Sequence, residues 1–228
     1  MKPPVPVPVA VFASGGGTNL QALLDHEAVS EEYKVTLVIS DRKGAGALER
    51  GRSVGRETCV IETNRRALSE VGRETLERLA DLEIQVILLA GYLRMIPAVV
   101  VAAYKRRALN IHPALLPAFG GKGMYGTRVH EAVLASGVEV TGATVHYVDK
   151  EYDTGSIVAQ WSVPVRRDDD VKSLAVRVLE VEHKLYPAVA DHLCRAVVEG
   201  VEPGPFNLTQ FNLPSMSPHT GADDSKTI

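Results

Sequence analysis

Short apolar runs separated by longer amphipathic stretches set the pattern of the first half of the chain. The apolar runs predict strands over residues 5–13, 35–40, 58–61, 84–90 and 108–112. Pro6 and Pro8 suit only the entry or an edge of a strand, so the first strand should begin near Val7. Helical spacing of apolar positions predicts helices after residue 18 and over 47–54, 65–82 and 98–104. This alternation predicts an α/β fold with a doubly wound, mostly parallel, Rossmann-like sheet and right-handed crossovers.

The second half of the chain predicts a C-terminal β-hairpin and a long helix. A short helix is expected over residues 127–136. The two strands of the hairpin are expected over 140–149 and 157–165, and the long helix over 171–199. The aspartates at 168–170 suit the N-cap of the long helix, and Pro187 predicts a kink or break within it. Polar residues, proline and glycine dominate from residue 202, and the last dozen residues should be disordered. We therefore predict one domain over residues 1–203 and a polar tail over 204–228.

Composition narrows the class of protein. The 228 residues are 45% hydrophobic, which is enough for one sizeable core. A net charge of −3 argues against a general nucleic-acid binder, because that affinity rests on neutralising phosphates. Cys59 and Cys194 are expected to be free thiols, and no Cys/His spacing suggests a metal site. The proline-rich start cannot form a signal peptide, and no 18-residue apolar run suggests a membrane span, so we expect a cytoplasmic protein.

The stretch from Ala108 to Pro117 carries the first candidate chemistry. Asn110 and His112 interrupt an apolar run, and side chains two apart lie on the same side of a strand. Pro113 removes a ladder donor, so the strand should stop there. Either residue alone is more often a hydrogen-bonded turn residue than a catalyst. Together they place an amide and an imidazole where open α/β sheets bind their ligands.

A glycine-rich loop, Ser14-Gly-Gly-Gly-Thr-Asn-Leu-Gln21, follows the first strand. Thr18 or Asn19 is expected to cap the next helix, whose N-terminus favours a phosphate. The loop is not a Walker loop, because no Gly-Lys-Ser/Thr follows it. It matches a dinucleotide-binding fingerprint poorly, because Leu20 occupies the third glycine position, although Asp41 lies where a ribose-binding acid is expected. A plain glycine-rich turn is the alternative. We favour a phosphate-type ligand, because a strand, a loop and a helix N-terminus follow one another here.

Two further loops are expected beside this site. Residues 91–97 follow a nearly unbroken apolar strand, and Leu93 to Ile96 form either ordinary packing or an apolar wall for a flat ligand. Residues 118–126 contain four glycines and predict a mobile loop, a candidate lid.

Four motifs in order give the chain a resemblance to a known family. Asn-Ile-His-Pro-Ala-Leu-Leu-Pro (110–117) and His-Tyr-Val-Asp-Lys-Glu-Tyr-Asp-Thr-Gly (146–155) resemble the two signatures of folate-dependent formyltransferases. The glycine loop and Leu-Ala-Gly-Tyr-Leu-Arg-Met-Ile (89–96) resemble the group of that family that acts on glycinamide ribonucleotide. The resemblance covers roughly residues 7 to 200. It implies transfer of the formyl group of 10-formyltetrahydrofolate to the amine of that ribonucleotide, a step of purine synthesis, without a metal.

The resemblance also implies which residues act. Its catalytic residues match Asn110, His112 and Asp153, and its ribonucleotide-binding residues match Gly17, Thr18, Asn19 and Glu182. Its folate-binding residues match Asn110 again and Arg65, Leu93, Arg94, Met95, Ile96, Asp149, Lys150, Glu151 and Tyr152. Residues 7–105 would then hold the ribonucleotide phosphate, and residues 106–203 would hold the folate and the catalytic groups. His146 matches a motif histidine that is equally well explained as a structural strand residue.

Two departures and several rivals accompany the resemblance. Residues 121–126 replace a Gly-x-x-x-His segment of several members, and Leu179 stands where a polar phosphate ligand is common. Methionyl-tRNA formyltransferases carry an additional C-terminal domain, and formyltetrahydrofolate deformylases an additional N-terminal one. A nicotinamide-dependent dehydrogenase and a catalytically inactive nucleotide-binding module are alternatives of other classes. We expect small-molecule substrates, no nucleic-acid or membrane partner, and a monomer or homodimer.

Overall fold

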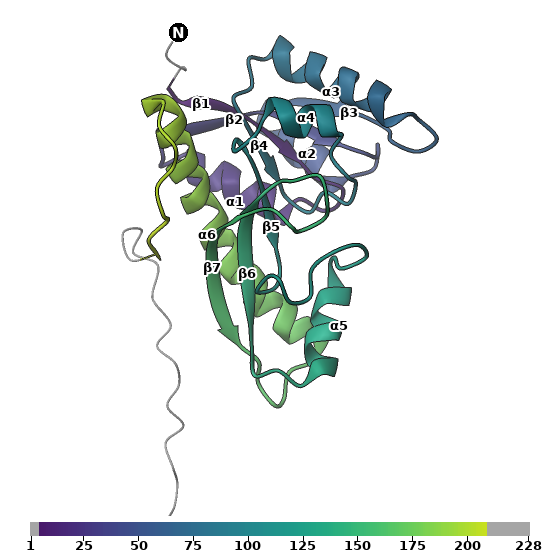
Figure 1. Ribbon diagram of the computed structural model, residues 1–228, viewed down its shortest axis with the longest axis vertical. Coiled ribbons are helices and arrows are strands. Elements are labelled where there is room, and N and C mark those ends of the chain that lie inside the picture. The colour runs from purple at the N-terminus through teal and green to yellow at the C-terminus, as the bar shows by residue number, and fades with distance from the viewer. Residues whose placement is uncertain (1–4, 209–228) are drawn as a thin grey trace, which may run out of the picture.

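The computed structural model describes residues 5–208 and contains a seven-stranded sheet flanked by helices (Figure 1). The strands are β1 (Val7–Phe12), β2 (Tyr33–Ser40), β3 (Glu57–Val60), β4 (Val86–Leu89), β5 (Ala108–His112), β6 (Val140–Tyr147) and β7 (Ile157–Pro164). The helices are α1 (Thr18–Glu27), α2 (Gly46–Ser53), α3 (Leu68–Asp81), α4 (Ala98–Ala103), α5 (Thr127–Ser136) and α6 (Val171–Glu199). The predicted element order is confirmed, and the boundaries differ by a few residues.

The sheet has the strand order β3-β2-β1-β4-β5-β6-β7. The first five strands in this order are parallel, whereas β6 and β7 are antiparallel to their neighbours. The chain leaves β1 toward β2 and β3 and later returns to β4 on the other side of β1. Ligands of open α/β sheets bind at such a switch point, outside the carboxyl ends of the strands. The predicted doubly wound, mostly parallel sheet with a C-terminal hairpin is confirmed.

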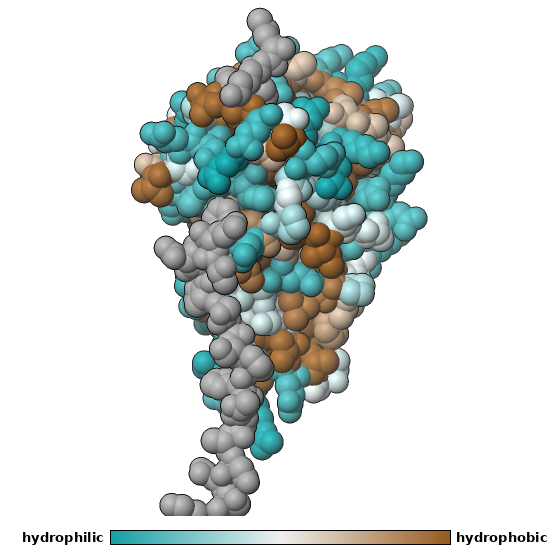
Figure 2. Space-filling model, turned by 60° about the vertical axis from the view of Figure 1, so that its left-hand side comes forward, coloured by the Kyte–Doolittle hydropathy of each residue, from teal (hydrophilic) through white to brown (hydrophobic). Residues whose placement is uncertain are grey.

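Alternate residues of β1 divide the core into two layers. Val9 and Val11 pack on one face with residues of α1 and α6, and Ala10 and Phe12 pack on the other with residues of α3 and α4. Both faces of this central strand are therefore covered, which explains its nearly continuous apolar sequence. On the face that Figure 2 shows, polar side chains cover much of the upper part, and apolar ones gather lower down.

Helix α6 packs against one face of the sheet and is hydrogen-bonded to β4 and β5. Asp170 caps the helix, since it accepts a hydrogen bond from Ser173 N, and Ser173 Oγ accepts one from Asp170 N. The buried Tyr186 hydroxyl lies 3.0 Å from Leu89 O and 3.1 Å from Leu109 O. The predicted break at Pro187 is wrong, because the helix continues through that residue to Glu199. Tertiary packing of the buried Pro187 outweighs its poor helix propensity.

A glycine, and not a residue with a capping side chain, occupies the N-cap of α1. The predicted cap of α1 by Thr18 or Asn19 is wrong, because the N-cap is Gly17, in the left-handed region at φ 76°, with no side-chain cap. A Cβ at Gly17 would also lie 2.8 Å from Ala47 Cα, so only glycine fits. The predicted disorder of the last dozen residues lies outside the described residues. No helix in the described part of the chain is long and apolar enough to cross a membrane.

Candidate active site

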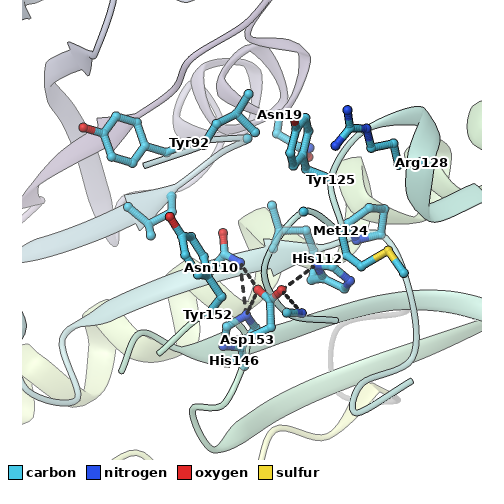
Figure 3. Close-up of a pocket in the computed structure, with 18 of the residues that line it drawn as sticks. Asn19, Tyr92, Asn110, His112, Met124, Tyr125, Arg128, His146, Tyr152 and Asp153 are labelled. Carbon is cyan, nitrogen blue, oxygen red and sulfur yellow. Dashed lines mark hydrogen bonds and ion pairs between the residues drawn. The ribbon is translucent and has the colours of Figure 1, made fainter. Parts of the chain in front are cut away.

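One cavity of about 650 Å³ lies along the carboxyl ends of β4 and β5. Its wall comes from the start of α1, the loop after β4, the end of β5, the loop before α5 and the turn after β6 (Figure 3). These segments are far apart in the sequence, and the sheet order brings them together. Most of the predicted site residues line this cavity.

Asn110, His112, Asp153 and His146 form a polar cluster in the wall of this cavity. Asn110 and His112 come from β5 and line the cavity on the same side, as the period of two predicts. His146 lies directly opposite Asn110 in the antiparallel pair of β5 and β6. Asp153 comes from the turn between β6 and β7 and lies between the two histidines (Figure 3).

The hydrogen bonds of His146 determine how Asn110 is oriented. His146 is 2% exposed, and its Nδ1 lies 2.9 Å from Tyr147 O. A carbonyl oxygen only accepts, so Nδ1 carries the hydrogen and Nε2 of the neutral ring is an acceptor. Nε2 lies 3.0 Å from Asn110 Nδ2, so the NH₂ side of the amide must face the histidine.

The same geometry leaves one N–H of Asn110 only weakly held. Asn110 Nδ2 lies 3.5 Å from Asp153 Oδ1, and that oxygen lies 3.6 Å from His146 Nε2. These two distances and the 3.0 Å contact make an angle at Nδ2 of roughly 60–70°, about half of the ~120° between the two N–H bonds of an amide. The two N–H bonds therefore cannot both point straight at these acceptors. The 3.5 Å contact to Asp153 is the longer of the two, so the N–H on that side is weakly held and can be redirected to a ligand.

His112 is held between a backbone carbonyl and a carboxylate. Its Nε2 lies 2.9 Å from Phe119 O, so Nε2 carries a hydrogen, and its Nδ1 lies 3.6 Å from Asp153 Oδ2. Burial lowers the pKa of His112, and the charge of Asp153 and the bond to Phe119 O oppose this without cancelling it. The imidazole is thus held neutral beside a carboxylate that stabilises its charged form.

Asp153 is fixed by its backbone and by its neighbours. Its φ is 57°, and its Oδ2 accepts a hydrogen bond of 2.8 Å from Gly121 N. Burial alone would raise the pKa of Asp153, but a hydrogen bond from His146 when its ring carries both protons, the charge of a protonated His112 and the Gly121 N–H bring it below the ordinary value. Gly155 permits the turn that places Asp153, because a Cβ there would lie 1.8 Å from Tyr147 O.

A second polar pair, Asn19 and Glu182, lies at another part of the wall. Asn19 Nδ2 donates a hydrogen bond of 2.6 Å to Glu182 Oε2. Glu182 is 6% exposed, and burial raises its pKa from 4.5 to about 7, although the bond from Asn19 opposes the shift. Asn19 Oδ1 is buried and has no hydrogen-bond partner among residues 5–208. This pair therefore offers an unsatisfied acceptor and a readily protonated carboxyl to a ligand.

The loop after β4 supplies the third part of the wall. Leu93, Arg94, Met95 and Ile96 all line the cavity, so their interpretation as a wall, rather than as packing alone, is supported. Leu93 N donates a hydrogen bond of 2.9 Å to Ser14 Oγ, which ties this loop to the end of β1. Arg94 Nε lies 3.0 Å from Asp41 Oδ2. Burial alone would raise the pKa of Asp41, but its bonds to Ser14 and Arg94 bring it below the ordinary value.

The structure brings together most of the predicted site residues, but not all of them. Asp149, Glu151, Tyr152, Thr18 and Asn19 line the cavity with those described above. Gly17, Arg65 and Lys150 are absent from its lining. Gly17 contributes by its backbone, Arg65 precedes α3 instead of opening it, and Lys150 is exposed in the turn.

Sequence reasoning missed the cavity residues contributed by the segment 124–130. Met124, Tyr125, Arg128 and His130 line the cavity. Met124 and Tyr125 lie in the loop over residues 118–126, which the sequence predicts as a candidate lid, whereas Arg128 and His130 lie at the start of the predicted helix over 127–136. In the described part of the chain, no group of three or more His, Cys, Asp or Glu residues is arranged to hold a metal ion.

The chain is similar to proteins named phosphoribosylglycinamide formyltransferase. The profile of the formyl transferase family matches residues 7–190. The chloroplastic phosphoribosylglycinamide formyltransferase of Arabidopsis thaliana is 44% identical over 201 residues, which are 86% of this chain and 68% of that protein. The Vigna unguiculata protein of the same name is 42% identical over 82% of this chain and 60% of its own length, so the chain spans less than two thirds of that relative. The crystal structure of phosphoribosylglycinamide formyltransferase from Bacillus halodurans is 34% identical, with a TM-score of 0.76, and the match covers 88% of this chain and all (100%) of that one.

Proposed function

Because the chain belongs to the formyl transferase family, we propose that it transfers the formyl group of 10-formyltetrahydrofolate to the amine of glycinamide ribonucleotide. The products are formylglycinamide ribonucleotide and tetrahydrofolate, in de novo purine biosynthesis. Relatives named for this activity support the substrate pair, and the family uses a folate-derived formyl donor. The observation that carries the proposal is that one cavity joins the polar cluster to both predicted binding regions.

The two substrates are assigned to opposite parts of the wall. The start of α1 and Glu182 would hold the ribonucleotide, with Glu182 bonded to ribose hydroxyls and the N-terminal N–H groups of α1 facing the phosphate. Residues 93–96 and the turn at 149–152 would hold the flat pterin ring. Asn110, His112 and Asp153 would then lie where the amine meets the formyl carbon.

Attack of the amine on the formyl carbon forms a C–N bond and a tetrahedral oxyanion. The N–H of Asn110 on the side of Asp153 is a suitable donor to that oxygen, since its 3.5 Å contact is weak and the shorter contact to His146 holds the other N–H. In this scheme His146 positions Asn110 and does not touch the substrate. Collapse of the intermediate then breaks the bond from carbon to N10 of the folate.

A proton must move from the attacking amine to the departing N10. His112 is neutral at rest, since burial lowers its pKa, so it can accept the proton of the amine, directly or through water. Asp153 then faces the imidazolium at 3.6 Å and stabilises its charge. Return of the proton to N10 completes the reaction and restores the resting state.

An absorbance assay that follows the folate tests this proposal. The purified protein is incubated with 10-formyltetrahydrofolate, with and without glycinamide ribonucleotide. Turnover that requires the ribonucleotide supports the transferase assignment. Equal turnover without the ribonucleotide would assign the chain to the deformylases, and no turnover in either mixture would favour a binding module.

A further inference from the structure

Two helix N-termini contribute to the cavity. Thr18 and Asn19 begin α1, and Thr127 and Arg128 begin α5. Neither helix has a side-chain cap, since the N-cap residues are Gly17 and Gly126. Both starts thus present free backbone N–H groups and the positive end of a helix dipole, which favour an anion.

Backbone N–H groups alone leave a phosphate monoester poorly neutralised. Such a group carries about −1.5 to −2 charges near neutral pH, whereas a helix N-terminus supplies roughly half a positive charge. Helix α6 adds no positive charge, because its cavity-lining residues are Ala175, Leu179 and Glu182. A cation must therefore come from another element if a phosphate is to be well bound.

Arg128 is the cation best placed for this task. The cationic side chains of the cavity wall are Arg94, Lys122 and Arg128, and Arg94 is paired with Asp41. Arg128 forms no ion pair with the described residues, and its guanidinium lies 5.1 Å from the centre of the Tyr125 ring. Figure 3 shows the guanidinium directed toward the part of the cavity where Asn19 lies. Lys122 lies in the loop over residues 118–126, whereas Arg128 lies in the first turn of α5 and has a planar guanidinium suited to binding phosphate.

His130 is an independent sign that a polar ligand belongs here. It lies in the first turns of α5, lines the cavity and is only 5% exposed. Its Nδ1 is buried without a hydrogen-bond partner among the residues that the structure describes. A buried polar atom without a partner is costly, so a ligand oxygen or a water bound by the ligand would satisfy it.

We propose that Arg128 binds the phosphate of the ribonucleotide, together with the N–H groups that begin α1 and α5. The phosphate would then lie between the two helix N-termini, held by a charged, bidentate donor. This inference rests on the proposed function, since it assigns one further ligand to the same substrate.

Arg50 is the main competitor of Arg128 for this role. It lines a second hollow, which it shares with Thr18 and other residues of α1. Its Nε donates a hydrogen bond of 2.8 Å to Gly16 O, and its Nη1 donates one of 2.9 Å to Gln21 Oε1. Because these donors already hold the loop, Arg50 has less of its fork free for a phosphate.

The test combines a charge-removing variant with a substrate that lacks the phosphate. Arg128→Gln should raise the KM for glycinamide ribonucleotide about tenfold or more and leave the KM for the folate within about twofold. Arg128→Lys should recover most of the loss. Lys172→Gln, which removes an exposed charge at the start of α6 outside the cavity lining, should match the wild type.

The phosphate-free glycinamide riboside separates a phosphate contact from a structural effect. With that substrate, kcat/KM of Arg128→Gln should equal that of the wild type, because no phosphate remains to lose. Inorganic phosphate should also inhibit the wild type competitively and the variant about tenfold more weakly. The proposal would be overturned if Arg128→Gln lowered kcat/KM equally for the ribonucleotide and the riboside, or if it left the ribonucleotide KM unchanged. An increase in that KM for Arg50→Gln but not for Arg128→Gln would also overturn it. If the wild type did not turn over at all, the proposed function would fail before this inference.

Discussion

Replacing Glu182 by glutamine should stabilise the ligand-free protein at neutral and alkaline pH. Burial raises the pKa of Glu182 from 4.5 to about 7 in the folded chain, so the folded state retains a proton that the unfolded state releases. A folded pKa above the unfolded one contributes stability that is fully present below pH 4.5 and is lost as the pH rises to about 7. At 1.36 kcal/mol per pH unit, the interval from 4.5 to about 7 corresponds to roughly 3 kcal/mol.

Glutamine keeps the shape of Glu182 and cannot ionise, so Glu182→Gln should lack this loss of stability. Urea unfolding of both proteins at pH 4.5, 6, 7 and 8 gives the difference in their free energies of unfolding. We expect that difference to shift in favour of the variant by about 3 kcal/mol across the range and to be constant above pH 8. Comparing the two proteins cancels the titration of all other groups.

Glu180→Gln is the matched control, because Glu180 lies on the same helix and is exposed. This variant measures the effect of removing a carboxylate from an exposed position of that helix. A pH-independent difference for Glu182→Gln would refute the account of a carboxyl whose charged form is penalised by burial. The same variant should bind the ribonucleotide more weakly, since an amide is a poorer acceptor for ribose hydroxyls than a carboxylate.

Three further predictions concern the polar cluster. Asn110→Ala should lower kcat by on the order of a hundredfold in the steady-state assay, and a near-normal kcat would exclude an oxyanion donor. His146→Leu alone should lower kcat about tenfold, and His146→Gln should recover part of that loss. Because His146 acts through the Asn110 amide, His146→Leu should lower kcat little further when Asn110→Ala is already present. A double variant whose loss equals the product of the two single losses would contradict this positioning role. Asp153→Asn should move the NMR titration of His112 to lower pH, since it removes the charge that raises the pKa of that imidazole, and an unshifted titration would refute the pairing.

The sequence predicted the fold well because its signals there are local. Period-two alternation and Pro113 placed Asn110 and His112 side by side at the end of β5, and the structure confirms this arrangement. An apolar run predicted β4 as a covered central strand, and its residues are buried. These patterns are visible in the sequence because the buried face of a strand carries apolar residues at regular positions.

The parts of the site that were missed depend on the path of loops. Arg65 is assigned to the folate only by the family resemblance, outside the four motifs, and the structure places it before α3, outside the cavity lining. The sequence around Arg128 and His130 has no pattern that marks a site. These residues reach the cavity because the path of the loop over residues 118–126 places the start of α5 there. The cap of α1 was misjudged because Gly17 is selected by its close approach to Ala47, a contact between distant elements.

The central claim is tested most directly by following the formyl group itself. The protein is incubated with 10-formyltetrahydrofolate carrying a ¹³C-labelled formyl group and with glycinamide ribonucleotide, and the products are separated and identified by mass spectrometry and ¹³C NMR. We predict that the label appears in an amide on the glycinamide nitrogen, in amounts equal to the tetrahydrofolate formed. Label recovered as formate, at a rate that does not depend on the ribonucleotide, would contradict the assignment of the chain as a formyl transferase acting on that amine.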